Sequence, residues 1–162
     1  MNLSRDFSPV FKNKKGLLFL VLFRFSSFFA KGNIVLKIVG FPIRIFYLVF
    51  VQWILGIDIP DRTKIGYGFN VWHGQGLIIH PDCKIGNFVQ IRHNTTIGQR
   101  RSNEAPPEIG NSVDIGAHSI IIGDIKIGDN CVIGAGTFVN KDIPENSVVY
   151  GNPMVIKSLI QK

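Results

Sequence analysis

Cysteine is scarce in this chain. The only two, Cys83 and Cys131, are spaced neither as a metal-binding pair nor as a disulfide framework. Long uncharged apolar segments are also lacking. The longest that begins in the N-terminal third, Ile45 to Ile57, has thirteen residues, whereas a membrane-spanning helix needs about 20. We therefore expect neither a transmembrane helix nor a disulfide-stabilised secreted domain. We predict a cytoplasmic protein with no metal.

Acidic residues are nearly absent from the N-terminal third. Residues 1–56 contain eight basic residues and one aspartate, while residues 57–162 contain ten basic and ten acidic residues, so the net charge of +7 belongs to the first segment. That segment also holds ten of the thirteen phenylalanines. Because its charges lie among apolar residues rather than along a polar face, nucleic-acid binding is not predicted.

The apolar runs of residues 1–56 predict helices at about 17–30 and about 42–55, with a short one near 34–39. Segments this apolar must be covered. Two interpretations stay open: the helices pack within an oligomer, or they make a peripheral membrane contact at the inner face of the cytoplasmic membrane. Both can hold together.

What the sequence has in abundance is a six-residue repeat that begins at Ile59. An aliphatic residue recurs every six positions, usually followed by glycine, with a small residue four places after it. A strand and a turn are all that fit in six residues, so the repeat predicts a parallel β-helix of about five coils, each made of three strands. The thirteen aliphatic positions are Ile59, Ile65, Val71, Ile79, Ile85, Ile91, Ile97, Ile109, Ile115, Ile121, Ile127, Ile133 and Val139. We predict three parts: a helical segment 1–56, the β-helix 57–150, and a tail 151–162 that ends in a short helix.

The repeat is interrupted twice, and interruptions re-aim side chains away from a regular scaffold. The first is a two-residue insertion between Val71 and Ile79 that contains Trp72, His73 and Gln75. The second is a loop at 99–107, with the sequence QRRSNEAPP. We expect a functional site at these two breaks.

His73 is the candidate general base. It lies inside the insertion, and Asp58, fifteen residues earlier, falls across the same edge of the prism. A carboxylate that holds one imidazole nitrogen orients the other for proton removal. Such a pair predicts attack of a substrate hydroxyl on an activated acyl donor. His93 occupies the equivalent position one coil later, so we expect it to stack beside His73 and line the acceptor pocket with Trp72 and Gln75.

The segments that carry these features resemble the left-handed β-helix acyltransferases, most closely the serine acetyltransferase-like branch. They are GIDIPDRTKIGYGFNVWHGQG at 56–76, IGNSVDIGAHSIIIGDIKIGDNCVIGAGTFV at 109–139 and GNP at 151–153. The resemblance implies left-handed winding, a homotrimer, and acetyl-CoA as co-substrate in a tunnel between subunits. It assigns His73 as the base and Asp58 as its partner, with Gly98, Ala117 and Ala135 along the pantetheine arm. Lys141 and the Arg100–Arg101 pair are either phosphate contacts or ordinary solvated charges.

Two departures from the serine enzymes bear on the acceptor. Trp72 stands where they carry an aspartate before the catalytic histidine, and Pro106 stands where they carry a loop histidine. Both changes remove groups suited to an amino acid, and a tryptophan offers an apolar face to a sugar ring. The pattern is closer to short acetyltransferases of capsule, exopolysaccharide and colanic-acid type. It implies a saccharide acceptor, which a lipid could carry.

Three alternatives stay open. One is a serine O-acetyltransferase, and another is a non-catalytic β-helix scaffold. The third is a γ-type carbonic anhydrase, which needs three histidines at a zinc ion, but the closely spaced histidine pair of that class is missing here. His80 and His118 are expected to be surface or corner residues.

Overall fold

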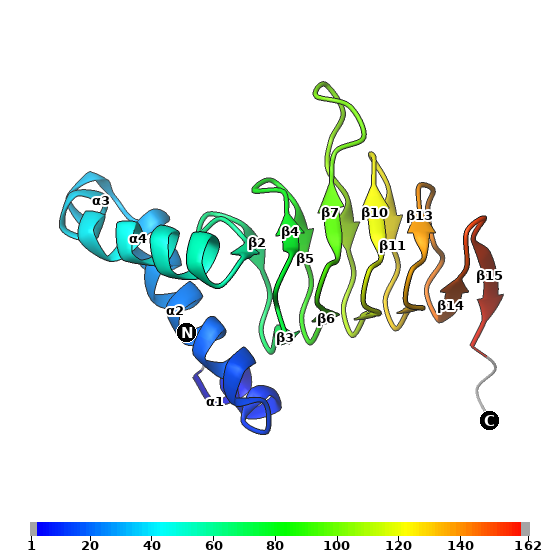
Figure 1. Ribbon diagram of the computed structural model, residues 1–162, viewed down its shortest axis with the longest axis horizontal. Coiled ribbons are helices and arrows are strands. Elements are labelled where there is room, and N and C mark those ends of the chain that lie inside the picture. Colours follow the sequence, from blue (N-terminus) through cyan, green and yellow to red (C-terminus); the bar gives the residue numbers. More distant parts are fainter. Residues whose placement is uncertain (1–2, 160–162) are drawn as a thin grey trace.

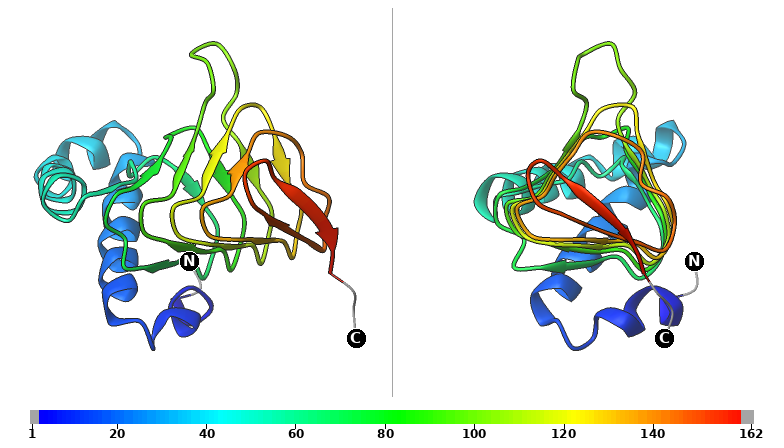
Figure 2. Two further views of the ribbon diagram at one scale, coloured as in Figure 1. Left: turned by 45° about the vertical axis from the view of Figure 1, so that its right-hand side comes forward. Right: turned by 90° about the vertical axis from the view of Figure 1, so that its right-hand side faces the viewer.

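The computed structural model describes residues 3–159 as a parallel β-helix with helices at one end. Figure 1 shows the coils stacked along the long axis, with the helices beside the first coil and the last strand at the opposite end. Viewed along that axis in Figure 2, the coils superimpose in a triangular outline from which one loop protrudes. The predicted left-handed β-helix of about five coils is confirmed.

Three sheets form the faces of the prism, and each takes its strands from successive coils. The first face contains β1 (Ile57–Asp58), β4 (Leu77–Ile79), β7 (Thr96–Gly98), β10 (Ile120–Ile122) and β13 (Phe138–Val139). The second contains β2 (Lys64–Ile65), β5 (Lys84–Ile85), β8 (Glu108–Ile109) and β11 (Lys126–Ile127). The third contains β3 (Asn70–Trp72), β6 (Gln90–Arg92), β9 (Asp114–Ile115), β12 (Val132–Ile133), β14 (Ser147–Tyr150) and β15 (Val155–Ser158).

The aliphatic residues of the repeat stack in register inside the prism. On the third face Val71 pairs with Ile91, and Ile91 pairs with Ile115. All three are buried, because alternate residues of a strand point to opposite sides of its sheet. Cys83 and Cys131 are buried free thiols, and each stands four places after an aliphatic residue of the repeat, at the small-residue position. Burial raises the pKa of the Cys83 thiol to about 12, which makes it an inert packing group.

The N-terminal third folds into helices that we call the helical cap (residues 3–54). It comprises α1 (Leu3–Phe7), the 3-10 helix η1 (Ser8–Val10), α2 (Lys14–Ala30), α3 (Ile34–Val39), α4 (Phe41–Tyr47) and the π-helix η2 (Leu48–Ile54). The three predicted helices are confirmed, whereas α1 and η1 were not predicted. Helix α2 begins before its predicted start because the Asn13 side chain accepts a hydrogen bond from the Gly16 N–H at 3.0 Å.

The cap continues the apolar core of the first coil. Phe19, Leu20 and Phe23 are buried against it, and the Phe19 ring meets the Phe69 ring edge-on with centroids 6.3 Å apart. Each such side chain contributes about 2 kcal/mol by leaving water. The cap therefore closes an end of the prism that would otherwise expose its interior.

Charged side chains fix the cap to the first coil. Arg24 forms a bidentate ion pair with Asp6, which is 1% exposed, and also donates to the carbonyls of Ile65 and Gly66. The Asp6 carboxylate also accepts a hydrogen bond from the Gly68 N–H of the first coil, at 3.0 Å. Asp61 on the first coil accepts hydrogen bonds from Ser26 and Arg44 of the cap.

The C-terminal tail corrects one prediction. Where residues 151–162 were expected to end in a short helix, Val155–Ser158 forms β15, which pairs antiparallel with β14. Gly151, at φ +89°, lets the chain reverse. The returning strand covers the edge that β14 would expose, and this pairing outweighs local helix preference. Residues 160–162 of the predicted helix lie outside the described residues.

Asp6→Ala is expected to lower the free energy of unfolding by about 3 kcal/mol or more, because it leaves the Arg24 guanidinium buried without its carboxylate. Urea unfolding followed by circular dichroism measures the change. Asp124→Ala is the matched control, since Asp124 is exposed and makes no hydrogen bond or ion pair with any residue of 3–159. Equal losses in the two variants would contradict the anchoring role of Asp6.

Candidate active site

The turn after β3 places His73 outside the regular prism. His73, Gly74 and Gly76 all have positive φ, at 65°, 45° and 67°. The turn is closed by hydrogen bonds from Gln75 N–H to the His73 carbonyl at 2.6 Å and from Gly76 N–H to the Gly56 carbonyl at 2.9 Å. Asn94 and His118 also have positive φ at this corner of later coils, so the backbone turn belongs to the repeat. The His73 side chain is exposed outside the prism, as predicted.

His73 lines a pocket of about 270 Å³ between this turn and the cap. The wall opposite the imidazole comes from helix α2, which contributes Lys15, Leu18 and Phe19. Sequence reasoning missed these three residues. The remaining lining residues are Leu55, Ile57, Val71, Gly74 and Gln75.

Asn13 holds the start of α2 against the strand that leads into the His73 turn. Its side-chain NH₂ donates to the Val71 carbonyl at 2.8 Å and to the Asn70 side chain at 2.7 Å. Val71 lies two residues before His73, so these hydrogen bonds fix the start of α2 to the strand that leads into the His73 turn. The only sequence signal for this contact is the helix-capping asparagine itself.

A row of histidines continues from His73 along the same corner. The His73 and His93 rings are 6.1 Å apart between centroids and meet edge-on, so the two residues are neighbours on successive coils as predicted, although His93 does not line the His73 pocket. His118, expected only as a surface residue, is exposed and also joins the row, 5.2 Å from His93. Nδ1 of His93 is buried and has no hydrogen-bond partner among the described residues. The row therefore offers an unsatisfied polar atom one coil beyond the base.

Asp58 and Trp72 lie outside the His73 pocket. No hydrogen bond or ion pair joins Asp58 to His73 in residues 3–159, and Asp58 instead lines a second pocket, on the first face. Trp72 is half-buried on the outer side of β3, where its indole N–H donates to the Gln90 side chain at 3.1 Å. The predicted contacts of both residues with the reacting groups are not formed in the isolated chain.

The second pocket, of about 420 Å³, brings together Gly98, Arg100 and Arg101. A Cβ added to Gly98 would find only His80 Cβ within 4 Å, at 3.9 Å. Glycine here leaves open space and an accessible backbone, flanked by two cations. This combination suits a thin phosphorylated ligand.

The other predicted cofactor residues, Ala117, Ala135 and Lys141, do not line this pocket. Ala117 and Ala135 follow β9 and β12 at the same corner of successive coils, where the Ala117 carbonyl accepts from the Gly136 N–H at 2.8 Å. Lys141 is exposed and makes no hydrogen bond or ion pair with any described residue. Within residues 3–159 no group of three or more histidine, cysteine, aspartate or glutamate side chains is placed to hold a metal.

Comparison with known proteins identifies the family. Residues 106–141 match the family described as bacterial transferase hexapeptide (six repeats). WcaB of Escherichia coli K12, whose name assigns it to colanic acid biosynthesis as an acetyltransferase, is 35% identical over 134 residues, which cover 82% of this chain and 83% of WcaB. The chain belongs to the hexapeptide-repeat acyltransferases. It is therefore an acetyltransferase of that family.

Serine acetyltransferases are similar to the same coils. This hexapeptide-repeat acyltransferase is 40% identical to serine acetyltransferase 2 of Arabidopsis thaliana over 105 residues, covering 64% of this chain but 32% of the plant protein. A crystal structure of the Brucella abortus serine acetyltransferase superimposes with a TM-score of 0.80 at 25% identity, covering 96% of this chain and 67% of that one. The Brucella enzyme has also been solved with coenzyme A.

Gly74→Ala tests how tightly the catalytic turn is packed. A Cβ at Gly74 would lie 2.6 Å from Ile57 Cδ1, and its φ is +45°. Gly136→Ala is the control, because Gly136 has a φ of +68° but nothing within 4 Å of the added atom. We expect the control to cost about 1 kcal/mol of unfolding free energy and Gly74→Ala about 1–3 kcal/mol more. If both variants lose the same unfolding free energy in urea, the Ile57 side chain moves aside without measurable strain.

Proposed function

We propose that this chain is an acetyl-CoA-dependent O-acetyltransferase that acts on a saccharide hydroxyl. The observation that carries the proposal is the composition of the His73 pocket. None of its nine lining residues is acidic, and its one charged side chain is Lys15. An amino acid acceptor brings an ammonium group that needs a carboxylate partner, whereas a neutral or anionic sugar does not.

The chemistry follows from the position of His73. The neutral imidazole removes the proton from the acceptor hydroxyl, and the developing alkoxide attacks the thioester carbonyl of acetyl-CoA. The tetrahedral intermediate collapses with loss of the coenzyme A thiolate, which takes up a proton. His93, with its unsatisfied Nδ1, and Gln75 lie on either side of the base and are proposed to hold the acceptor.

Acetyl-CoA is proposed to bind in the second pocket, where Arg100, which also pairs with Glu104, and Arg101 lie near Gly98 and could meet the phosphates. Ala117 and Ala135, at the corner that follows the third face, are proposed to lie along the pantetheine arm. Lys141 is proposed as a further phosphate contact. This site is proposed to be completed by a second subunit of a homotrimer. Exposed aliphatic residues on the outer faces of the coils support such packing: Ile78, Ile120 and Val132.

We further propose that the acceptor saccharide is lipid-linked and meets the enzyme at the inner face of the cytoplasmic membrane. The basic, apolar composition of residues 1–56 supports this location. Within residues 3–159 no helix is long and apolar enough to span a bilayer, so any membrane contact made by these helices would be peripheral.

His73→Ala is expected to lower acetyl transfer by about 10²–10⁴-fold, because it removes the general base. Transfer of labelled acetyl from acetyl-CoA is measured into serine, nucleotide sugars and membrane glycolipid extract, alongside equilibrium binding of acetyl-CoA. Label in a saccharide, lost in the variant with acetyl-CoA binding retained, supports the proposal. Label in serine would contradict the saccharide acceptor, and a fully active variant would contradict the role of His73.

Asp58→Asn is expected to lower kcat by at least about tenfold, if Asp58 orients the imidazole in the reacting complex. Asp124→Asn is the matched control. A normal kcat in Asp58→Asn would show that His73 acts without this carboxylate.

A further inference from the structure

Helix α2 is apolar on two opposite sides, and only one of them is covered. Phe19, Leu20 and Phe23 face the first coil and are at most 1% exposed. The opposite stripe is exposed, and it comprises Leu18, Val21, Phe25 and Phe28. A helix that is apolar all round is normally buried on all sides. The exposed stripe therefore requires a covering that this chain does not supply within residues 3–159.

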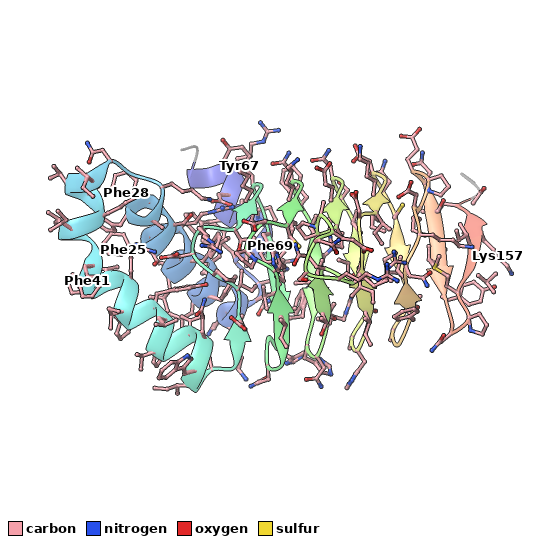
Figure 3. The ribbon with its side chains drawn as sticks, turned by 90° about the horizontal axis from the view of Figure 1, so that it is seen from above. Phe25, Phe28, Phe41, Tyr67, Phe69 and Lys157 are labelled. Atoms are coloured by element: carbon pink, nitrogen blue, oxygen red, sulfur yellow. The ribbon has the colours of Figure 1, made fainter. Side chains whose placement is uncertain are left out.

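The same arrangement recurs in the rest of the cap. Helix α3 buries none of its residues, and Ile34 and Ile38 are 69% and 67% exposed. We define the outer cap face by the exposed apolar residues Leu18, Val21, Phe25, Phe28, Ile34, Val35, Ile38, Val39, Phe41, Ile45, Phe46, Val49, Trp53 and Ile54. Figure 3 shows Phe25, Phe28 and Phe41 at the helical end of the molecule, opposite Lys157.

An apolar groove joins α2 to α4 at this face. It has a volume of about 350 Å³ and is lined by Leu22, Phe25, Pro42, Ile43, Phe46 and Tyr47. The Tyr47 hydroxyl is already used, since it donates to the Ile59 carbonyl at 2.7 Å. The groove therefore presents hydrocarbon and aromatic surface, which suits an acyl chain better than a polar peptide.

The exposed charge of the cap is of one sign. The only acidic residue of the cap, Asp6, is buried and paired with Arg24. The exposed charged residues are basic: Arg5, Lys12, Lys14, Lys15, Lys31 and Lys37. Arg5 lies over the Tyr67 ring and Lys31 donates to the Thr63 carbonyl at 3.0 Å, so Lys12, Lys14, Lys15 and Lys37 are the ones that the proposal uses. Basic residues on the same helices as an apolar face complement an anionic lipid surface. Two copies meeting through this face would instead bring like charges together.

We propose that the outer cap face binds the surface of an anionic lipid bilayer. Helices α2, α3 and α4 lie in the interfacial region, with their exposed apolar side chains among the acyl chains and their lysines at the headgroups. Binding is peripheral, because no described helix can span the bilayer. The ion pairs and hydrogen bonds that fix the cap to the first coil hold the β-helix on the aqueous side.

This docking also concerns the pocket of the base, a consequence that rests on the proposed function. Leu18 belongs to the outer cap face and also lines the His73 pocket, and Lys15 of the same helix lines that pocket too. A saccharide carried on a membrane lipid would thus enter between the bilayer and the catalytic turn. Lys15 would meet an anionic group of that acceptor.

Flotation of the full chain with lipid vesicles tests the docking without acetyl-CoA or acceptor. The vesicles contain phosphatidylcholine alone or phosphatidylcholine with phosphatidylglycerol, at low and high salt. Wild type is expected to float with the phosphatidylglycerol vesicles, and more weakly at high salt. Ile38→Glu should reduce binding by at least about tenfold, because it places a charge in the apolar interface. Val155→Glu, an equally apolar exposed site at the far end of the molecule, is the matched control and should bind as wild type.

Thermal melts confirm that each variant is folded, and His73→Ala should float as wild type, which separates docking from catalysis. Failure of wild type to bind anionic vesicles would overturn the proposal. So would equal effects of Ile38→Glu and Val155→Glu. If sedimentation equilibrium shows that Ile38→Glu abolishes self-association while vesicle binding is absent, a second copy covers the face instead.

Discussion

The first coil of a β-helix has an open end, and the need to close it shapes the rest of this molecule. Interior residues such as Phe69 and Val71 would face water there, and the helical cap covers them with Phe19, Leu20 and Phe23. Apolar contact alone would leave the orientation of the cap loosely defined. The buried Asp6–Arg24 pair and its bonds to the Ile65 and Gly66 carbonyls add direction, since each bond satisfies a backbone group at a fixed position.

The same closure builds the candidate active site. The capping residue Asn13 starts helix α2 and binds Val71, so the helix that covers the core also forms the far wall of the His73 pocket. A helix shifted along the coil by one turn, about 5 Å, would move Lys15 and Leu18 away from the imidazole. Stability and acceptor binding are thus properties of one contact surface.

The repeat could be predicted almost completely from the sequence, because a buried aliphatic residue in every strand leaves a period that no other fold shares. The insertion at Val71–Ile79 likewise revealed that His73 leaves the prism. Side-chain direction near that insertion could not be predicted. Register places Asp58 near the same edge, but the two side chains project into different pockets. The helix predicted for the C-terminal tail was wrong for a related reason. Strand β15 is stabilised by pairing with β14 rather than by the local preference of its own residues.

The side of the His73 pocket that comes from the cap could not be predicted from the sequence. It depends on a hydrogen bond between Asn13 and Val71, which are 58 positions apart in the chain. The coils are similar in WcaB and in serine acetyltransferases, and in this chain they carry His73, proposed as the base. The His73 pocket takes its only charged side chain, Lys15, from the cap. The repeat thus sets the position of His73, while the cap sets the charge of the pocket beside it.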